Sequence, residues 1–136
     1  MKQRFARNLN ELSAIVASTE AFFAREGLPS SLRNRADLCI EELFVNMVTY
    51  NTESNEDIQL ELEACDPGLR IRLVDRDVDR FDPRMGPAVD TEASIEEREP
   101  GGLGLYLVMK MASEIRYAYR DRVSTITLDL EADDHV

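Results

Sequence analysis

The sequence has a single histidine, and that residue, His135, is the penultimate one of the 136 given. Chain ends are usually poorly ordered, so we expect no catalytic or metal-binding histidine inside the fold. This excludes Ser-His-Asp triads, Cys-His dyads and histidine-rich metal sites. Any chemistry must therefore come from carboxylates, amides, hydroxyls and backbone groups.

Cysteines and long apolar stretches are also scarce. Cys39 and Cys65 lack the spacing of metal ligands, and we interpret both as small buried residues in a reducing compartment. No apolar run approaches the roughly 20 residues that a membrane helix needs. The basic residues 1–4 are not followed by the apolar stretch of a secretory signal. We therefore expect a cytoplasmic protein that does not contact a membrane.

Positive charge is limited as well, because 16 Lys and Arg residues stand against 27 Asp and Glu residues. The formal net charge of −11 opposes binding to nucleic acid or to an anionic membrane. A content of 43% hydrophobic and 32% charged residues is nevertheless typical of a globular domain rather than a disordered acidic tail. The length predicts one domain over residues 1–136.

Apolar periodicity predicts two helices in the first half of the chain. An edge strand over residues 3–9 is expected to lead into a helix that is capped by Asn10 and ended by Gly27. A second helix is expected over residues 30–50, with Ser30 or Ser31 as its cap. The apolar stripe that should face the core consists of Ala36, Ile40, Leu43 and Met47.

The second half of the chain alternates apolar and polar residues. A hairpin is predicted over residues 58–75 with its turn at Pro67-Gly68, and further strands over 115–130. Between them lie a polar connection, 76–100, and a third helix, 101–111. Helices and antiparallel strands in blocks predict an α+β two-layer sandwich, with a mixed, mostly antiparallel sheet and helices on one face.

Polar residues in two parts of the chain are candidates for binding or catalysis. Glu42 and Asn46 are four residues apart on the second helix, so their side chains share a face. Carboxylate and amide oxygens suit Mg²⁺, or a base beside a metal ligand, although this spacing is also common on solvated helix faces. Asp75 ends a predicted strand, where it can accept a hydrogen bond from an exocyclic amine such as that of adenine. The alternating Asp and Arg residues that follow also fit a solvated turn.

Glycines open the third predicted helix at Gly101, Gly102 and Gly104. Glycine lets backbone amides approach a phosphate closely, and the N-terminus of a helix adds partial positive charge. The same glycines also fit a tight turn from loop to helix. The Walker lysine and the strand–glycine–helix pattern of dinucleotide sites are both missing, which excludes P-loop and Rossmann sites.

The order of these motifs resembles that of the GHKL (Bergerat) ATPase superfamily. The motifs are Glu42-x-x-x-Asn46, an aspartate at a strand end before Phe81-Asp82-Pro83, and Gly101-Gly102-Leu103-Gly104-Leu105. Residues 41–46 and 96–104 resemble more specifically the anti-sigma factor serine/threonine kinases of bacterial partner switching. The resemblance covers nearly the whole chain.

The resemblance implies a site for ATP and Mg²⁺ between the sheet and the helices, closed by a lid over residues 82–100. Asn46 would be the Mg²⁺ ligand, and Glu42 would be the catalytic base that orients a serine hydroxyl of a protein substrate. The implied nucleotide-binding residues are Asn46, Asp75, Asp77, Arg98, Gly101, Gly102, Leu103, Gly104 and Thr127. Such kinases bind a sigma factor or an anti-sigma-factor antagonist and phosphorylate the antagonist, and the resemblance also allows a homodimer.

The middle motif departs from the family pattern, which is Asp-x-Gly. The chain has Asp75-Arg76-Asp77 there, and an ungapped count back from Phe81 would instead place Arg76 and Val78 at the two positions. Either alignment loses the glycine, so a side chain would crowd the base and a further carboxylate would repel phosphates. The alternative function is a module that keeps the fold and sequesters a protein partner without catalysis. A histidine kinase fragment is disfavoured, because no dimerisation helix with a histidine precedes the domain.

Overall fold

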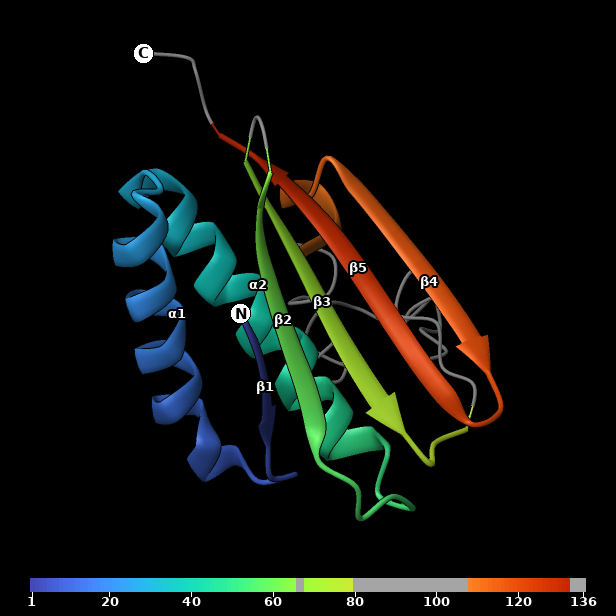
Figure 1. Cartoon of the computed structure of the whole chain (residues 1–136). Coiled ribbons are helices and arrows are strands. Elements are labelled where there is room, and N and C mark those ends of the chain that lie inside the picture. Colours follow the sequence, from blue (N-terminus) through green and yellow to red (C-terminus); the bar gives the residue numbers. More distant parts are fainter. Residues whose placement is uncertain (66–67, 80–107, 133–136) are drawn as a thin grey trace, which may run out of the picture.

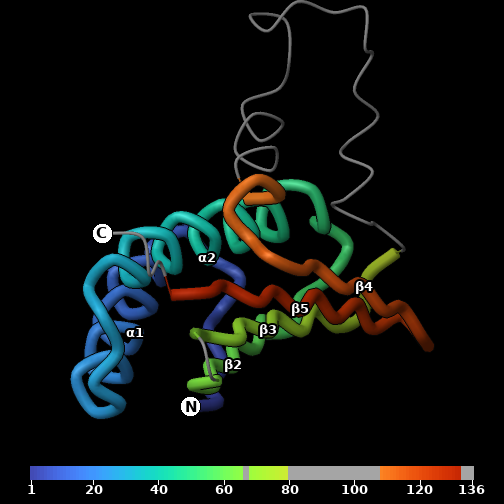
Figure 2. Tube along the Cα trace, turned by 90° about the horizontal axis from the view of Figure 1, so that it is seen from above, coloured from blue at the N-terminus to red at the C-terminus, as the bar shows by residue number. Residues whose placement is uncertain are grey.

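The structure is a computed structural model that describes residues 1–65, 68–79 and 108–132. One layer is a five-stranded sheet with the strand order β1-β2-β3-β5-β4, and two helices, α1 and α2, cover one of its faces (Figures 1 and 2). All four described strand pairings are antiparallel. The predicted α+β two-layer sandwich is confirmed, and its described sheet is antiparallel throughout.

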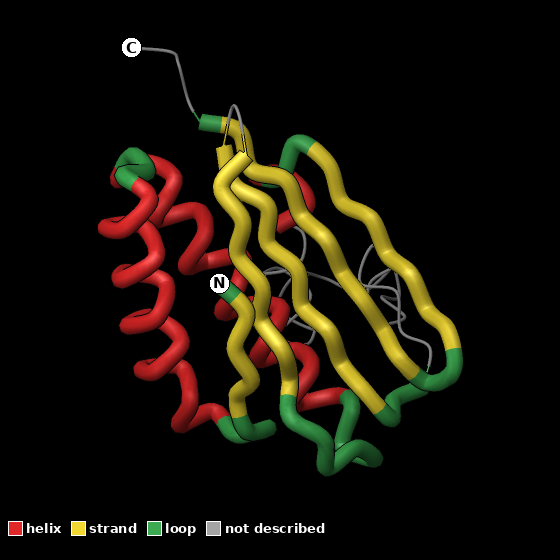
Figure 3. Tube along the Cα trace, in the orientation of Figure 1, coloured by secondary structure: helices red, strands yellow, loops and turns green. Residues whose placement is uncertain are grey.

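The five strands lie side by side in one sheet (Figure 3), and successive side chains along each strand point alternately toward the helices and toward the open face. Their bounds are β1 (Lys2–Phe5), β2 (Ile58–Cys65), β3 (Gly68–Arg76), β4 (Glu114–Arg120) and β5 (Val123–Glu131). On β3 the apolar residues Leu69, Ile71 and Leu73 are buried, whereas Arg70 and Arg72 between them are half-buried on the open face. Asp75 continues the apolar row, so this carboxylate faces the helices.

The first helix begins differently from the prediction. The strand β1 ends at Phe5 rather than at residue 9, and a 3₁₀ turn, η1 (Leu9–Glu11), precedes α1 (Leu12–Glu26). Asn8 caps this turn, because its side chain accepts a hydrogen bond from the backbone N–H of Asn10 at 2.8 Å. Glu11 stands at the N-cap position of α1 without a side-chain cap, so the predicted cap Asn10 does not cap the helix. The predicted end at Gly27 is confirmed, since Gly27 has the left-handed φ of 64° that favours glycine.

The second helix, α2 (Ser30–Tyr50), has the predicted length but not the predicted cap. Pro29 stands at the N-cap position and no side chain caps the helix, so Ser30 and Ser31 already lie within it. The fixed φ of proline suits the entry to a helix without a side-chain acceptor. The predicted stripe is buried as expected: Ala36, Ile40, Leu43 and Met47 are all at most 4% exposed.

The core lies between α2 and the central strands. Phe44 and Cys39 of α2 are fully buried together with Ile71 and Leu73 of β3. Cys39 is buried as expected, and burial raises the pKa of its thiol to about 12, whereas Cys65 is only partly buried, so the expectation was wrong for it. Within the described ranges, neither helix combines the length and the apolarity needed to cross a membrane.

Only the end of the third predicted helix is described. Residues 108–111 are helical, and Val108 is buried in the core. The predicted lid over 82–100 and the glycine-rich start of this helix lie outside the described residues.

Candidate functional site

Asn46 is the first predicted site residue that the structure places in an unusual environment. It lies on α2 beside the buried stripe and is only 4% exposed, so it is not part of a solvated helix face. Its Oδ1 atom is buried and accepts no hydrogen bond from any described residue. A buried acceptor without a donor costs about 1–3 kcal/mol. The position therefore fits a cation or an N–H or O–H donor from a bound molecule.

Glu42 lies one turn before Asn46 on the same side of α2 and is partly exposed. Burial raises the pKa of its carboxyl group, and the charge of neighbouring Glu41 raises it further. A general base works best when its pKa is near the working pH, so this shift favours such a role. The amide oxygen of Asn46 thus lacks a hydrogen-bond donor, and the carboxyl group of Glu42, one turn away, has a raised pKa.

Asp75 ends its predicted strand, but it does not belong to a solvated turn. It is fully buried, and its carboxylate is held by residues from two distant segments. The Nδ2 of Asn51 donates a hydrogen bond to Oδ2 at 2.7 Å, and the guanidinium of Arg7 forms an ion pair with Oδ1. Arg7 also donates from Nη1 to the carbonyl oxygen of Met47 at 3.2 Å. Because Met47 directly follows Asn46, these contacts link Asp75 to the turn of α2 that carries Asn46.

Ser124 is a site candidate that sequence reasoning missed. It is paired with Asp75 across β3 and β5, so the two side chains lie on the same face, and Ser124 is only 3% exposed. Thr127 lies an odd number of positions further along β5 and therefore faces the opposite side of the sheet. There its hydroxyl lies 3.3 Å from Nε of Arg72. The structure therefore does not bring Thr127 to Asp75. Only the register of β5 against β3 identifies Ser124 as the neighbour of Asp75.

Asp77 follows β3 with a left-handed φ of 59°, a conformation that glycine adopts most readily. Asp tolerates this region better than most other residues. Of the two alignments of the middle motif, this backbone favours the one that sets Asp75 and Asp77 in the places of aspartate and glycine. The chain keeps the backbone conformation although it has lost the glycine.

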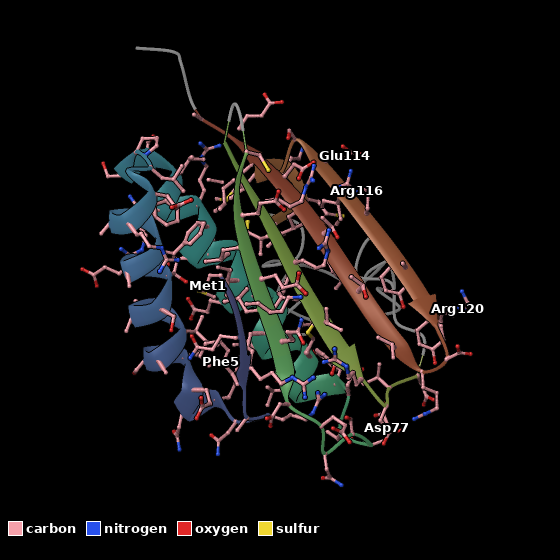
Figure 4. The ribbon with its side chains drawn as sticks, viewed as in Figure 1. Met1, Phe5, Asp77, Glu114, Arg116 and Arg120 are labelled. Carbon is pink, nitrogen blue, oxygen red and sulfur yellow. The ribbon has the colours of Figure 1, made fainter. Side chains whose placement is uncertain are left out.

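The carboxylate of Asp77 pairs with Arg122 in the turn between β4 and β5. Nε of Arg122 donates to Asp77 at 3.0 Å, and its Nη1 donates to Asp79 at 2.9 Å. Figure 4 shows Asp77 at the end of the sheet where β3 finishes. The backbone of Val78 is also bound, because its N–H donates to the carbonyl of Arg122 at 3.1 Å. The structure thus pairs this extra carboxylate with a cation and does not direct it into the group around Asp75.

The remaining predicted residues, Arg98, Gly101, Gly102, Leu103 and Gly104, lie outside the described residues. Within the described ranges, no group of three His, Cys, Asp or Glu side chains could hold a metal ion.

The chain was compared with protein-family profiles, curated proteins and solved structures. The profile of the histidine kinase-like ATPase domain matches residues 5–130. No curated protein matches the chain. Among solved structures, the chain is similar to the RsbU and RsbW domains of Rv1364c from Mycobacterium tuberculosis, with a TM-score of 0.65 and 18% identity. The similarity covers 98% of this chain but 33% of that one, so the chain spans about a third of the solved protein and the likeness shows the fold. Because the family match runs from β1 to β5, the chain belongs to the histidine kinase-like ATPase domain family.

Proposed function

We propose that the protein is an ATP-dependent serine/threonine kinase that acts as an anti-sigma regulatory factor and phosphorylates a serine of an anti-sigma-factor antagonist. Membership in the ATPase domain family implies ATP binding. The likeness to a structure that contains an RsbW domain and the sequence resemblance to anti-sigma factor kinases support the finer assignment. The observation that carries the proposal is the buried, donor-less Oδ1 of Asn46, one turn from a Glu42 carboxyl whose pKa is raised.

Asp75 and Ser124 form the base end of the proposed site. The carboxylate of Asp75 accepts a hydrogen bond from the exocyclic amine of adenine, and the hydroxyl of Ser124 lies next to it on the same face. Arg98, Gly101, Gly102, Leu103 and Gly104 remain the proposed phosphate contacts on the strength of the sequence motif alone.

Asn46 and Glu42 form the phosphate end. The amide oxygen of Asn46 would hold Mg²⁺, which would supply neutralising charge on the phosphates. Glu42 accepts the proton of the substrate serine hydroxyl, whose oxygen attacks the γ-phosphorus of ATP while ADP leaves. Partners of the proposed kinase are therefore an antagonist protein as substrate and a sigma factor as the sequestered protein.

A binding module without catalysis is the second candidate function. The lost glycine at Asp77 and the complete burial of Asp75 favour it, because both restrict the approach of a base to the end of β3. Such a module would sequester the same kinds of protein partner and would not respond to ATP.

Thermal unfolding with ATP in the presence and absence of Mg²⁺ separates these functions. ATP with Mg²⁺ at 100 times the Kd should stabilise the wild type by about 2.7 kcal/mol. Asn46→Ala should lose most of this gain, because the amide oxygen that would bind Mg²⁺ is missing. Asn34→Ala, at an exposed position of the same helix, is the matched control and should keep it. No change in the melting temperature of the wild type at millimolar ATP would contradict the kinase function.

A further inference from the structure

Arg7 occupies a position that the proposed function does not explain. It lies between β1 and η1, yet its side chain is only 9% exposed and its guanidinium reaches Asp75, 68 positions away in the chain. The arginines of the open sheet face differ, because the side chains of Arg70 and Arg72 are 32% and 36% exposed and pair with carboxylates at the surface.

The contacts of Arg7 fix the orientation of the Asp75 carboxylate. Arg7 binds one carboxylate oxygen, and Asn51 donates to the other, so the group cannot rotate without breaking one of the two contacts. Arg7 is also the ion-pair partner of this fully buried carboxylate, and removing one member of a buried pair is costly. Each carboxylate oxygen can accept two hydrogen bonds, so the group keeps acceptor capacity for a further donor.

Arg7 further connects the two ends of the proposed site. Its Nη1 donates to the carbonyl of Met47, the residue after Asn46, while its Nη2 pairs with Asp75. The buried Nε of Arg7 and the buried Oδ1 of Asn46 both have no hydrogen-bond partner among the described residues. One side chain thus ties the carboxylate at the base end to the helical turn at the phosphate end.

We propose that Arg7 is the positioning residue that gives the site its preference for adenine, since it holds the Asp75 carboxylate in the orientation that meets the exocyclic amine of the base. This inference rests on the proposed nucleotide-binding function. A hypoxanthine base carries a carbonyl oxygen where adenine has its amine. A fixed carboxylate attracts the amine and repels the carbonyl, whereas a carboxylate that turns away does neither.

Calorimetric titration with ATP and with inosine triphosphate, both with Mg²⁺, tests this role. A hydrogen bond to a charged group predicts that the wild type binds ATP about 10- to 100-fold more tightly than inosine triphosphate. Arg7→Met should reduce the ratio to about 3-fold or less, mainly through weaker binding of ATP, and Arg7→Lys should restore part of the preference. Arg70→Met, on the open face, is the matched control and should retain the wild-type ratio.

The ratio distinguishes positioning from a purely structural role. Equal losses of affinity for both nucleotides in Arg7→Met would show a structural role and overturn the proposal. Should Arg7→Met fail to fold, the pair Arg7→Met with Asp75→Asn removes the unpaired buried charge, and it should bind both nucleotides with similar affinity. A retained preference in that double variant would overturn the proposal as well. A wild type that binds both nucleotides equally contradicts this inference alone, whereas a wild type that binds neither contradicts the proposed function and the inference together.

Discussion

The two faces of the sheet use the same kinds of polar side chain in opposite ways. On the open face, Arg70 pairs with Asp129 at 2.8 Å and Arg72 with Glu61 at 3.2 Å, and the paired side chains are between 18% and 36% exposed. On the face toward the helices, Arg7 pairs with Asp75, and these side chains are 9% and 0% exposed. Among the described residues, buried polar atoms without a hydrogen-bond partner occur on both sides: Nε of Arg7 and Oδ1 of Asn46 on the helix side, and Nη1 of Arg76 on the open face. The helix side differs in offering a buried acceptor without a donor beside a fully buried ion pair, and we therefore expect the ligand on that side.

The largest expected difference between the faces is in stability. Arg7→Met should lower the free energy of unfolding by about 3–5 kcal/mol, because it leaves the buried charge of Asp75 without its cation. Arg70→Met should cost less than about 1 kcal/mol, because water screens an exposed pair. Urea denaturation of the two variants measures both values. Equal losses of unfolding free energy in the two variants would contradict the claim that the buried ion pair contributes more to stability than the pair on the open face.

The next expected effect concerns Glu42 and is kinetic. Glu42→Gln removes the proposed base and should slow phosphoryl transfer to a serine-containing antagonist by about 100-fold or more, with little change in ATP affinity. Transfer of labelled γ-phosphate to that protein measures the rate. Glu41→Gln, on an exposed neighbour, is the control and should transfer phosphate at a rate close to that of the wild type. An unchanged rate in Glu42→Gln would assign Glu42 a structural role only.

The smallest expected effect is a pH dependence of opposite sign on the two faces. The hydrogen bond from Arg70 lowers the pKa of Asp129 below its ordinary 3.8, so this carboxyl stabilises the fold above pH 3.8 and loses that contribution as the pH falls through the lowered value. Burial raises the pKa of Glu42 above 4.5, so its contribution to stability is present below pH 4.5 and is lost as the pH rises through the raised value.

Unfolding experiments across this pH range can resolve the two signs. Relative to the wild type, Asp129→Asn should lose stability as the pH rises from 3 to 5, and Glu42→Gln should gain stability above pH 4.5. Each difference should stay below about 1 kcal/mol, since both groups are partly solvated. If the stability of both variants changed in the same direction with pH, the opposite pKa shifts of Asp129 and Glu42 would be contradicted.

The helices and the core stripe could be predicted because their signals are local. Ala36, Ile40 and Leu43 recur at helical spacing, and Gly27 marks a helix end by its own conformational preference. The cap predicted at Asn10 was wrong, because a 3₁₀ turn capped by Asn8 precedes α1, and α1 itself has no side-chain cap. Two asparagines close together carry the same capping chemistry, and sequence alone does not choose between them.

The polar site could be predicted only in part. Asn46 and Asp75 were found because each belongs to a motif, but their burial was not foreseen. Both Ser124 and Thr127 carry a hydroxyl group, so the sequence does not show which of them lies beside Asp75. The register of β5 against β3 is needed to identify Ser124. Arg7 has no local signal, since its partner lies 68 positions away in the chain and only the folded sheet brings the two together.

A titration of the protein with ATP and Mg²⁺, followed by NMR of the backbone and side-chain amides, tests most directly whether the buried face is the nucleotide site. We expect the resonances of Asn46, Asp75 and Ser124 to shift, and those of Arg72 and Thr127 on the open face to stay in place. Shifts confined to the open face, or no shifts at millimolar ATP, would contradict this assignment.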